Sequence, residues 1–529
     1  MKKIAFYTLA AIFAMAAMSC QKEEVELTSG TGERTVTCIF ANDATKTTLD
    51  ADGQTPVWAA GDVIRLLDEI TYEDITLTEE DIAQMKGDQI SLIFKTNLTG
   101  WPLYAIYPAS ATDMKVGIDE QVAIKIPTAQ DGSFEHANIC VAMGDEDDMM
   151  VFRNATSVLK FTQAEAGVTG IKVEAENAIA GDCLVSFDED GTLYNTMLKT
   201  GTSSSQITVA SDKARDVYYI AAAAKVTTGN TKLTFFSADG YATANKSSKD
   251  LKANTMYTLG NIDDMGLEFK AGRGFLNGHE FVQIGNQKWA TENLYITESG
   301  KQPWLGSGYP RGDFFRWGET RTIYNEFKIE NIPSNDNEGA YVFNTFHEDI
   351  AGCPPETFWN GWGNFDINKV DANGFLTKEN DPVAKYWGGT WHMPNGGDNN
   401  DFVKLYSSTF WAFDTVNYGC YVFEPDAKHP AGTLVLGLDG LNKQDALLYF
   451  PATGWALSTA VSNTGFMIKQ WTNHYYPNYD GTKNVITSFQ IIWDPDNESI
   501  KKYYVPTDKI VFAAKYGWWL GYNIRPVSE

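Results

Sequence analysis

Residues 182–197 read DCLVSFDEDGTLYNTM, and this stretch decides the fold of the first half of the chain. Two short runs with apolar, β-branched and aromatic side chains flank the pair Asp190-Gly191. An Asp-Gly pair between two such runs is typical of the tight turn in a β-hairpin. The stretch therefore predicts two antiparallel strands joined by a turn at Asp190-Gly191.

Runs of the same kind fill the chain on both sides of this hairpin. They are TVTCIFA (35–41), DVIRLLD (62–68), ISLIFK (90–95), PLYAIYPA (102–109), VAIKIP (122–127), SVLKFT (157–162), GIKVEAE (170–176), QITVA (206–210), VYYIAAA (217–223) and KLTFFS (232–237). Each shows a period of two or a short buried run, which is the pattern of a strand. Helical periodicity is nearly absent up to about residue 265. The first half is therefore predicted to be mainly β, built from β-sandwich domains.

The second half has a different composition. After the Gly-rich connector GLEFKAGRGFLNG (266–278), Trp, Tyr, Asn and Gly become dense. One segment, DFVKLYSS (401–408), predicts a short amphipathic helix that begins after the polar run at 395–400. The rest is predicted to be strands and long loops, the composition of a loop-rich α+β module that displays a surface on a fixed scaffold.

The N-terminus predicts export and a lipid anchor. An apolar run follows Lys2 and Lys3 and ends at small residues directly before Cys20. The run is too short for a comfortable bilayer span, so residues 1–19 are interpreted as a signal peptide. A cysteine in this place is typical of a lipobox, in which the thiol takes a diacylglycerol through a thioether. Cys20 would then anchor the chain in outer-membrane lipid and begin a tether at 20–34. The alternative is an ordinary cleaved signal with an incidental cysteine.

Length, charge and cysteine usage limit the class of protein. A chain of 529 residues with 43% hydrophobic content is expected to form two to four domains with real cores. The formal charge of −26 argues against nucleic acid as a partner, because there is no excess of Lys or Arg to bind phosphate. The remaining cysteines are widely spaced and form no CxxC or Cys/His cluster, so neither zinc nor a disulfide framework is indicated.

Several motifs of the first half, in their order, resemble the fimbrillin-like fimbrial subunits of Bacteroidetes. They are KTTL (46–49), VWAAGDVI (57–64), YAIYP (104–108), IPTAQ (126–130), FRNA (152–155), VLKF (158–161) and MYTL (256–259). The resemblance covers about residues 35–263. It implies two transthyretin-like β-sandwich domains, at 35–150 and 151–264. Trp58 and Gly61-Asp62 of the second motif are interpreted as a core residue and a turn.

The second half resembles the Fibrobacter succinogenes major paralogous domain, a module related to C-type-lectin-like folds. The motifs that carry this are VQIGNQKW (282–289), GDFFRWGE (312–319), WGGTWHMP (387–394), LLYFPATGW (447–455) and GYNIRPV (521–527). The resemblance implies a linker at 265–274 and a C-type-lectin-like domain at 275–529. KQWTNH (469–474) departs from that family's usual strand, so a contact surface built there would be particular to this chain.

Catalytic constellations are not found in the sequence. The six histidines show no HExxH spacing, and no G-x-S-x-G elbow, P-loop or dinucleotide fingerprint occurs. A binding or structural protein is therefore expected rather than an enzyme. An enzyme that acts on glycans is a third option beside the two binding functions given below.

Calcium is the one cofactor that the sequence raises. Two short polar stretches look superficially like calcium-lectin elements and supply hard oxygen ligands, namely Glu424 and Asp426 in the first and Asp494, Asp496 and Asn497 in the second. The alternative is that both are polar turns, since Pro and Asp occur in turns for backbone reasons alone.

Aromatic side chains are the candidates for ligand contact. Trp359, Trp362, Trp471, Tyr475 and Tyr476 could stack on sugar rings. Core packing is the alternative for each of them, and for Trp304. The segment WNGWGNF (359–365) favours binding, because its Gly and Asn content indicates a surface loop.

Together these features predict a fimbrial tip subunit or adhesin of cell-surface fimbriae, which mediates cell adhesion and contributes to biofilm formation. The resemblance implies export as a lipoprotein to the outer membrane, trimming after a basic residue, and joining to shaft subunits by strand exchange. Arg34 is the candidate trimming site, although residues 21–34 make a poor strand to remove. Mass spectrometry that found only an acylated Cys20 terminus would rule this trimming out.

The terminal position within a fimbria is predicted from the far end of the chain. The sequence stops at RPVSE (525–529), inside the last motif of the module, with no spare strand to donate. The expected ligand is a host or bacterial surface glycan or protein. The alternative function is a free-standing, glycan-binding lipoprotein of the outer membrane that is not assembled into fimbriae.

Overall fold

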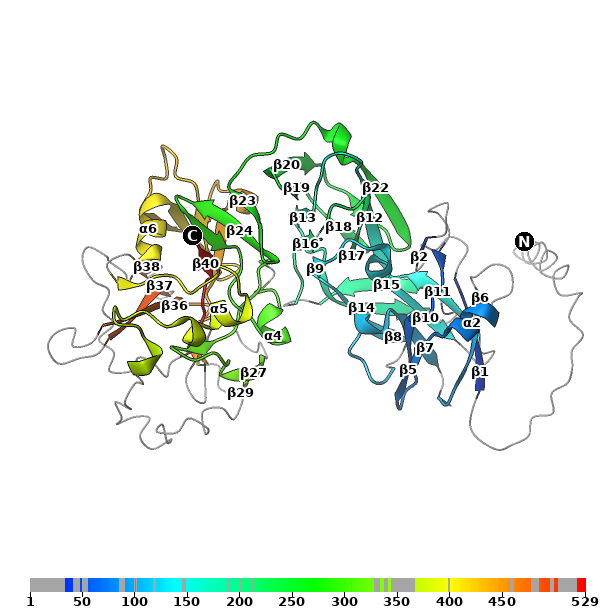
Figure 1. Cartoon of the computed structure of the whole chain (residues 1–529). Helices are drawn as coiled ribbons and strands as arrows, with labels where there is room; N and C mark the ends of the chain where they lie inside the picture. The colour runs from blue at the N-terminus through cyan, green and yellow to red at the C-terminus, as the bar shows by residue number, and fades with distance from the viewer. Residues whose placement is uncertain are drawn as a thin grey trace, which may run out of the picture.

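The computed structural model describes residues 34–40, 48–49, 56–84, 91–98, 100, 102–117, 120–144, 149–188, 191, 193–199, 202–211, 213–305, 307–327, 334–336, 341–343, 367–397, 400–456, 461–476, 485–494, 499–502 and 521–529. Strands dominate throughout, which confirms the mainly β fold predicted from the sequence. The first β-sandwich, the second β-sandwich and the C-terminal domain follow one another, with the second sandwich in the middle (Figure 1). Within the described residues, no helix is long and apolar enough to cross a membrane.

The first sandwich contains a seven-stranded sheet. Its strands, in spatial order, are β5 (Tyr72–Thr76), β4 (Val63–Leu67), β7 (Leu103–Tyr107), β10 (Cys140–Gly144), β11 (Met149–Asn154), β1 (Arg34–Phe40) and β6 (Ser91–Thr96). The pair β2 (Thr48–Leu49) and β3 (Pro56–Val57) and the helix α2 (Glu79–Gln84) accompany it. Trp58 is 2% exposed and packs edge-on against Tyr107 and Phe152, so the interpretation of Trp58 as a core residue is confirmed.

The second sandwich is built from three main sheets. The first sheet has the order β20 (Gly240–Lys246), β19 (Thr231–Ser237), β13 (Gly170–Ala175), β16 (Gln206–Ala210) and β9 (Ala129–Gln130). The second has the order β17 (Val217–Ala223), β12 (Thr156–Thr162) and β22 (Thr255–Asn261). The third has the order β15 (Leu193–Leu198), β14 (Gly181–Phe187) and β8 (Gln121–Ile126). A small pair, β18 (Val226–Thr227) and β21 (Asp250–Leu251), and the helix α3 (Phe134–Ala137) complete it. The predicted hairpin is present, because β14 and β15 pair antiparallel from Cys183 opposite Leu198 to Phe187 opposite Leu193.

Two strands of the second sandwich come from the sequence range assigned to the first domain. β8 pairs antiparallel with β14, from Ile126 opposite Gly181, and β9 pairs parallel with β16. The range 35–150 thus contributes β8 and β9 to its neighbour, while β11 at 149–154 belongs to the first sheet. One buried core runs through both sandwiches, since it includes Tyr104 and Ile106 of β7 beside Val122 and Ile124 of β8.

The described part of the C-terminal domain holds five sheets with short helices. In spatial order, one sheet contains β23 (Arg273–Leu276), β24 (His279–Ile284), β25 (Gln287–Ala290) and β40 (Val527–Ser528), and a second contains β26 (Phe315–Arg316), β39 (Gly521–Tyr522), β34 (Trp455–Ala456), β35 (Val461–Thr464) and β28 (Ser334–Asp336). A third is the pair β27 (Tyr324–Phe327) and β29 (Tyr341–Phe343), and a fourth contains β32 (Thr433–Leu436), β30 (Phe410–Asp414), β31 (Gly419–Phe423) and β33 (Leu448–Pro451). The fifth contains β36 (Met467–Tyr476), β37 (Val485–Asp494) and β38 (Ser499–Lys502).

The helices of this domain are α4 (Glu298–Lys301), α5 (Pro382–Tyr386) and α6 (Asp401–Ser408). Single 3-10 turns of this domain lie at Ile367–Lys369, Lys378–Asn380 and Lys443–Asp445. Two more lie earlier in the chain, at Ala109–Ala111 after β7 and at Ile262–Met265 after β22. The helix predicted at 401–408 is confirmed as α6. The side chain of Asn400 accepts a hydrogen bond from the Val403 backbone N–H, which caps its first turn, and Phe402 and Leu405 face the core.

Candidate functional site

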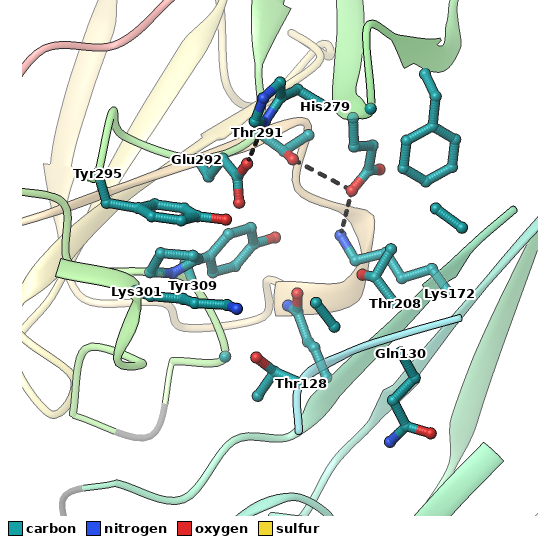
Figure 2. Close-up of a pocket in the computed structure, with 18 residues that line it drawn as sticks. Thr128, Gln130, Lys172, Thr208, His279, Thr291, Glu292, Tyr295, Lys301 and Tyr309 are labelled. Atoms are coloured by element: carbon teal, nitrogen blue, oxygen red, sulfur yellow. Dashed lines mark hydrogen bonds and ion pairs between the residues drawn. The ribbon is translucent and has the colours of Figure 1, made fainter. Parts of the chain in front are cut away.

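The junction between the second sandwich and the C-terminal domain contains a pocket of about 150 Å³ (Figure 2). The second sandwich contributes Thr128 and residues of β9, β13 and β16. The C-terminal domain contributes β24 and the chain between Thr291 and Pro310. Because two domains supply the walls, the shape of the pocket depends on how these domains dock.

A buried ion pair crosses this junction. The Nζ of Lys172 donates to Oε2 of Glu280 at 3.2 Å and lies 3.6 Å from Oε1 of Glu174. Lys172 and Glu174 stand two residues apart on β13, so both side chains leave the same face of the sheet. All three residues are buried, with exposed fractions of 3%, 5% and 6% for Lys172, Glu174 and Glu280. The second sandwich and the C-terminal domain therefore share one desolvated charge cluster.

The charge state of this cluster follows from two opposing effects on Lys172. Burial alone would lower the pKa of Lys172, because it disfavours the charged ammonium. The carboxylates of Glu174 and Glu280 outweigh burial and hold that pKa above its ordinary value. The ring of Tyr309 lies 5.4 Å from the ammonium and adds a cation–π contact. Lys172 is therefore charged across the physiological pH range.

A second set of contacts fastens the same two domains through main-chain oxygens. The side-chain amide of Gln444 donates to the carbonyls of Glu174 at 2.8 Å and Asn230 at 3.2 Å, and Lys232 donates back to the Gln444 carbonyl. The Gln444 and Lys232 bonds hold the 442–447 segment against the second sandwich. Within the C-terminal domain, the guanidinium of Arg273 on β23 donates to the carbonyls of Ala446 and Leu447, both at 3.2 Å, and also holds this segment.

His279 lies in the wall of the pocket that the C-terminal domain supplies, and two contacts fix its ring. Its ring stacks on Trp387 with centroids 3.5 Å apart and planes within 7°, and its Nδ1 lies 3.0 Å from Oε1 of Glu292. The Glu292 carboxylate, and then burial, raise the pKa of Tyr295, so the Tyr295 hydroxyl remains protonated. Figure 2 shows Tyr295 and Tyr309 next to each other with their hydroxyls directed the same way.

The sequence prediction of exposed aromatic contacts is wrong for two of its residues. Trp471 is 2% exposed, stacks on Tyr522 at 3.9 Å and donates its indole N–H to the Phe315 carbonyl at 2.8 Å. Tyr475 is 5% exposed in the same core, and Trp304 is fully buried. Large rings with one polar atom are satisfied inside this domain, so the alternative of core packing holds for them.

The other aromatic candidates are placed only in part. Trp359 and Trp362 lie outside the described residues, and Tyr476 ends β36 with its backbone paired opposite Val485. The segment 469–474 departs from the family's usual strand, so a contact surface built there would be particular to this chain. Its side chains are instead buried, including Lys469, Asn473 and His474 at 7–8% exposed.

The candidate calcium ligands lie in different surroundings. Asp426 Oδ1 accepts hydrogen bonds from the backbone N–H groups of Lys428 and His429, both at 2.7 Å, and its Oδ2 lies 3.1 Å from Nδ1 of His429. This is the polar turn given above as the alternative, with Glu424 exposed beside it. Asp494 ends β37, and Asp496 and Asn497 lie outside the described residues. Within the described part of the chain, no three His, Cys, Asp or Glu gather to hold a metal ion.

The processing residues are placed only in part. Cys20 lies outside the described residues. Arg34 is the first residue of β1, and its backbone stands opposite Thr96 of β6. Cleavage after Arg34 would thus leave residues 35–40 of β1 in the sheet between β6 and β11.

The junction residues were missed by sequence reasoning. In GIKVEAE, Lys172 and Glu174 alternate with Ile171 and Val173, which is the usual pattern of a strand with one solvated face. Both faces of β13 are buried in the structure, because the C-terminal domain covers the face that carries the charges. The sequence pattern at this strand was an alternation of Lys and Glu with apolar residues, and such a pattern does not indicate that another domain covers the charged face.

Comparison with known proteins gives distant structural likenesses. No protein-family model and no curated protein matches the chain. A candidate cell adhesion protein from Bacteroides uniformis is 14% identical, with 45% of this chain and 97% of that chain covered and a TM-score of 0.29. A fimbrial assembly protein from Parabacteroides distasonis is 9% identical, with coverages of 45% and 99% and a TM-score of 0.24.

The tip fimbrial protein Mfa3 from Porphyromonas gingivalis, with a C-terminal truncation, is 8% identical. The match covers 40% of this chain and 80% of that chain, with a TM-score of 0.20. At TM-scores this low, these likenesses decide neither the fold nor the function of this chain.

Proposed function

We propose that this chain is the tip subunit of a cell-surface fimbria, in which the C-terminal domain is the adhesive part. The proposal rests on the order of fimbrillin-like and lectin-like motifs in the sequence and on how the C-terminal residues are used. In this role the sandwiches connect the C-terminal domain to a shaft, which joins by strand exchange at a sheet edge.

The observation that carries the proposal is the position of residues 521–528. β39 pairs with β26 and β34, and β40 pairs with β25 through Lys288 opposite Ser528 and Trp289 opposite Val527. Arg525 is fully buried and donates to the carbonyls of Ala290 at 3.1 Å and Tyr449 at 2.5 Å. These residues complete sheets of their own domain, so they are not a free strand for a neighbouring subunit.

The junction supports the same role. An adhesive domain at the end of a filament must transmit pulling force to the part that holds it. The Lys172–Glu280 pair and the Gln444 and Lys232 contacts bind the C-terminal domain to the second sandwich over a buried area rather than through a linker alone. The C-terminal domain is thus held in one orientation relative to the second sandwich.

Filament association tests the proposal directly. Fimbriae sheared from cells and purified by density should contain this chain together with the shaft protein, at far fewer copies than the shaft protein. Quantitative mass spectrometry of the sheared fraction measures both. If the chain stays entirely with the cell envelope while shaft filaments are recovered, it is the free-standing surface lipoprotein instead.

Lipidation is proposed at Cys20. The variant Cys20→Ser is expected to lose incorporation of an alkyne-labelled fatty acid almost completely, because no thiol remains at the lipobox position to form the thioether. In-gel fluorescence after click labelling measures this, with Cys353→Ser as the control that keeps the label. Full labelling of Cys20→Ser would contradict the anchor.

A further inference from the structure

The pocket at the domain junction has a buried acceptor without a partner. Glu280 is 6% exposed, and its Oε2 accepts from Lys172 at 3.2 Å and from the Thr291 hydroxyl at 3.2 Å. Its other oxygen, Oε1, has no hydrogen-bond partner within the part of the chain that the structure describes. A buried carboxylate oxygen left in this way is costly, and a ligand that donates a hydrogen bond to it is favoured.

Donors line other parts of the same pocket. Lys301, on α4, points its ammonium into the pocket (Figure 2) and forms no ion pair among the described residues. The hydroxyls of Thr128 and Thr208, from the second sandwich, also make no hydrogen bond within the described chain. By contrast, the side-chain amide of Gln130 already has hydrogen-bond partners: its nitrogen donates to the carbonyls of Pro127 and Ala221, and its oxygen accepts from the Ala221 backbone N–H.

Two tyrosine rings give the pocket an apolar wall. Tyr295 and Tyr309 both line it (Figure 2), and because the Tyr309 ring stacks on Tyr449 and also contacts Lys172, the half-buried Tyr295 is the ring that a ligand would meet. Burial raises the pKa of Tyr309, and the Glu292 carboxylate raises that of Tyr295, so both hydroxyls stay protonated and can donate. The rim is open to solvent at Ala129 and Gly278, both of which are exposed.

From these features we propose that the junction pocket binds a single neutral sugar unit. Sugar hydroxyls both donate and accept, so one ring can satisfy the Glu280 oxygen and also the Lys301 ammonium and the threonine hydroxyls. Its C–H face can pack on a tyrosine ring. A pocket of about 150 Å³ that is open on one side can hold one sugar ring, with part of the ring in the open mouth.

The charges of the pocket argue against the other small ligands. An anion would meet Glu280 and Glu292, and a cation would meet Lys301 and Lys172. A neutral polyol avoids both repulsions, because it presents dipoles of either sign. Among the described residues, the candidate aromatic and calcium residues of the sequence do not line this pocket.

Since both domains line the pocket, sugar binding and docking are linked. A ligand that contacts Thr208 of the second sandwich and Lys301 of the C-terminal domain stabilises the docked state, by mass action. The biological setting of this inference rests on the proposed adhesive function, but the binding itself does not need a fimbria. A failure of binding and a failure of fimbrial association are therefore separate results.

The experiment is a titration of the purified full chain with the methyl glycosides of glucose, galactose, mannose and N-acetylglucosamine. Saturation-transfer NMR and the midpoint of thermal unfolding are the two readouts. N-acetylneuraminic acid serves as the anionic probe and glycine as the zwitterionic probe. At least one neutral glycoside is expected to bind and to raise the melting temperature, whereas neither charged probe should bind.

Variants assign the binding to the pocket. Thr208→Val and Lys301→Met should each weaken the bound glycoside by about tenfold, the loss expected for one hydrogen bond. The matched control Thr243→Val, at an exposed position on β20 of the same sheet, should leave affinity unchanged. The proposal is overturned if no neutral glycoside binds, if a charged probe binds instead, or if both pocket variants bind as the parent does.

Discussion

Replacing Lys172 by methionine is expected to cost about 3–5 kcal/mol of unfolding free energy, because breaking a buried ion pair leaves an uncompensated charge. Here the loss leaves the carboxylates of Glu174 and Glu280 close together at 5% and 6% exposure. Equilibrium unfolding in urea at pH 7 measures the effect. Limited proteolysis of the connector at 266–272, which is already partly exposed, should also become faster, because undocking leaves it freer to adopt the extended form that a protease binds.

Two further variants decide whether the ion pair is responsible. Lys213→Met changes an exposed lysine of the second sandwich and should have little effect. The triple variant Lys172→Met, Glu174→Leu and Glu280→Leu removes every charge of the cluster and should recover most of the loss. If Lys172→Met were as stable as Lys213→Met, the cluster would not fasten the junction.

The sign of the pH dependence follows from the raised pKa of Lys172. A lysine whose pKa is higher in the folded chain than in the unfolded chain contributes stability at every pH below its ordinary value of about 10.4. That contribution is lost only as the pH rises through the folded pKa. Docking through this pair is therefore expected to be insensitive to pH over the neutral range.

Lys469 is expected to behave in the opposite way. It is 8% exposed, and its Nζ lies 4.7 Å and 4.8 Å from the ring centroids of Trp455 and Tyr522. Burial lowers the pKa of Lys469 to about 7. Between about pH 7 and 10.4 the unfolded chain binds a proton that the folded chain does not, so the unfolding free energy should rise with pH.

The variant Lys469→Met should therefore be more stable than the parent at pH 6, on the order of a few kcal/mol, and the difference should vanish near pH 10. The two rings offset part of the penalty by cation–π attraction, which keeps the gain below the full burial cost. Urea unfolding at pH 6, 8 and 10 tests this, with the exposed Lys428→Met as control. A parent protein whose stability does not rise from pH 7 to 10 relative to Lys469→Met would contradict it.

The sequence predicted those elements whose signals are local. The hairpin at 182–197 needed only two strand-like runs and an Asp-Gly turn, and helix α6 needed only apolar spacing and a cap at Asn400. The assignment of β8 and β9 to the second sandwich could not be predicted, because a strand's period of two does not name its partner.

The candidate site shows the same limit more strongly. Trp471 was predicted to contact a ligand, yet an amphipathic ring can satisfy its N–H inside a core as well as on a surface. Lys172 and Glu280 are 108 residues apart, and neither has a neighbour in sequence that indicates burial. Only the docking of two domains brings them to one pocket, and docking is not a local property of the chain.

The central claim, that this chain ends a fimbria, is tested most directly by immunogold electron microscopy of intact cells. Antibody raised against the C-terminal domain should place gold at the free ends of filaments, with a second antibody against the shaft protein along their length. Labelling along the shafts, or on the cell surface away from any filament, would contradict the claim.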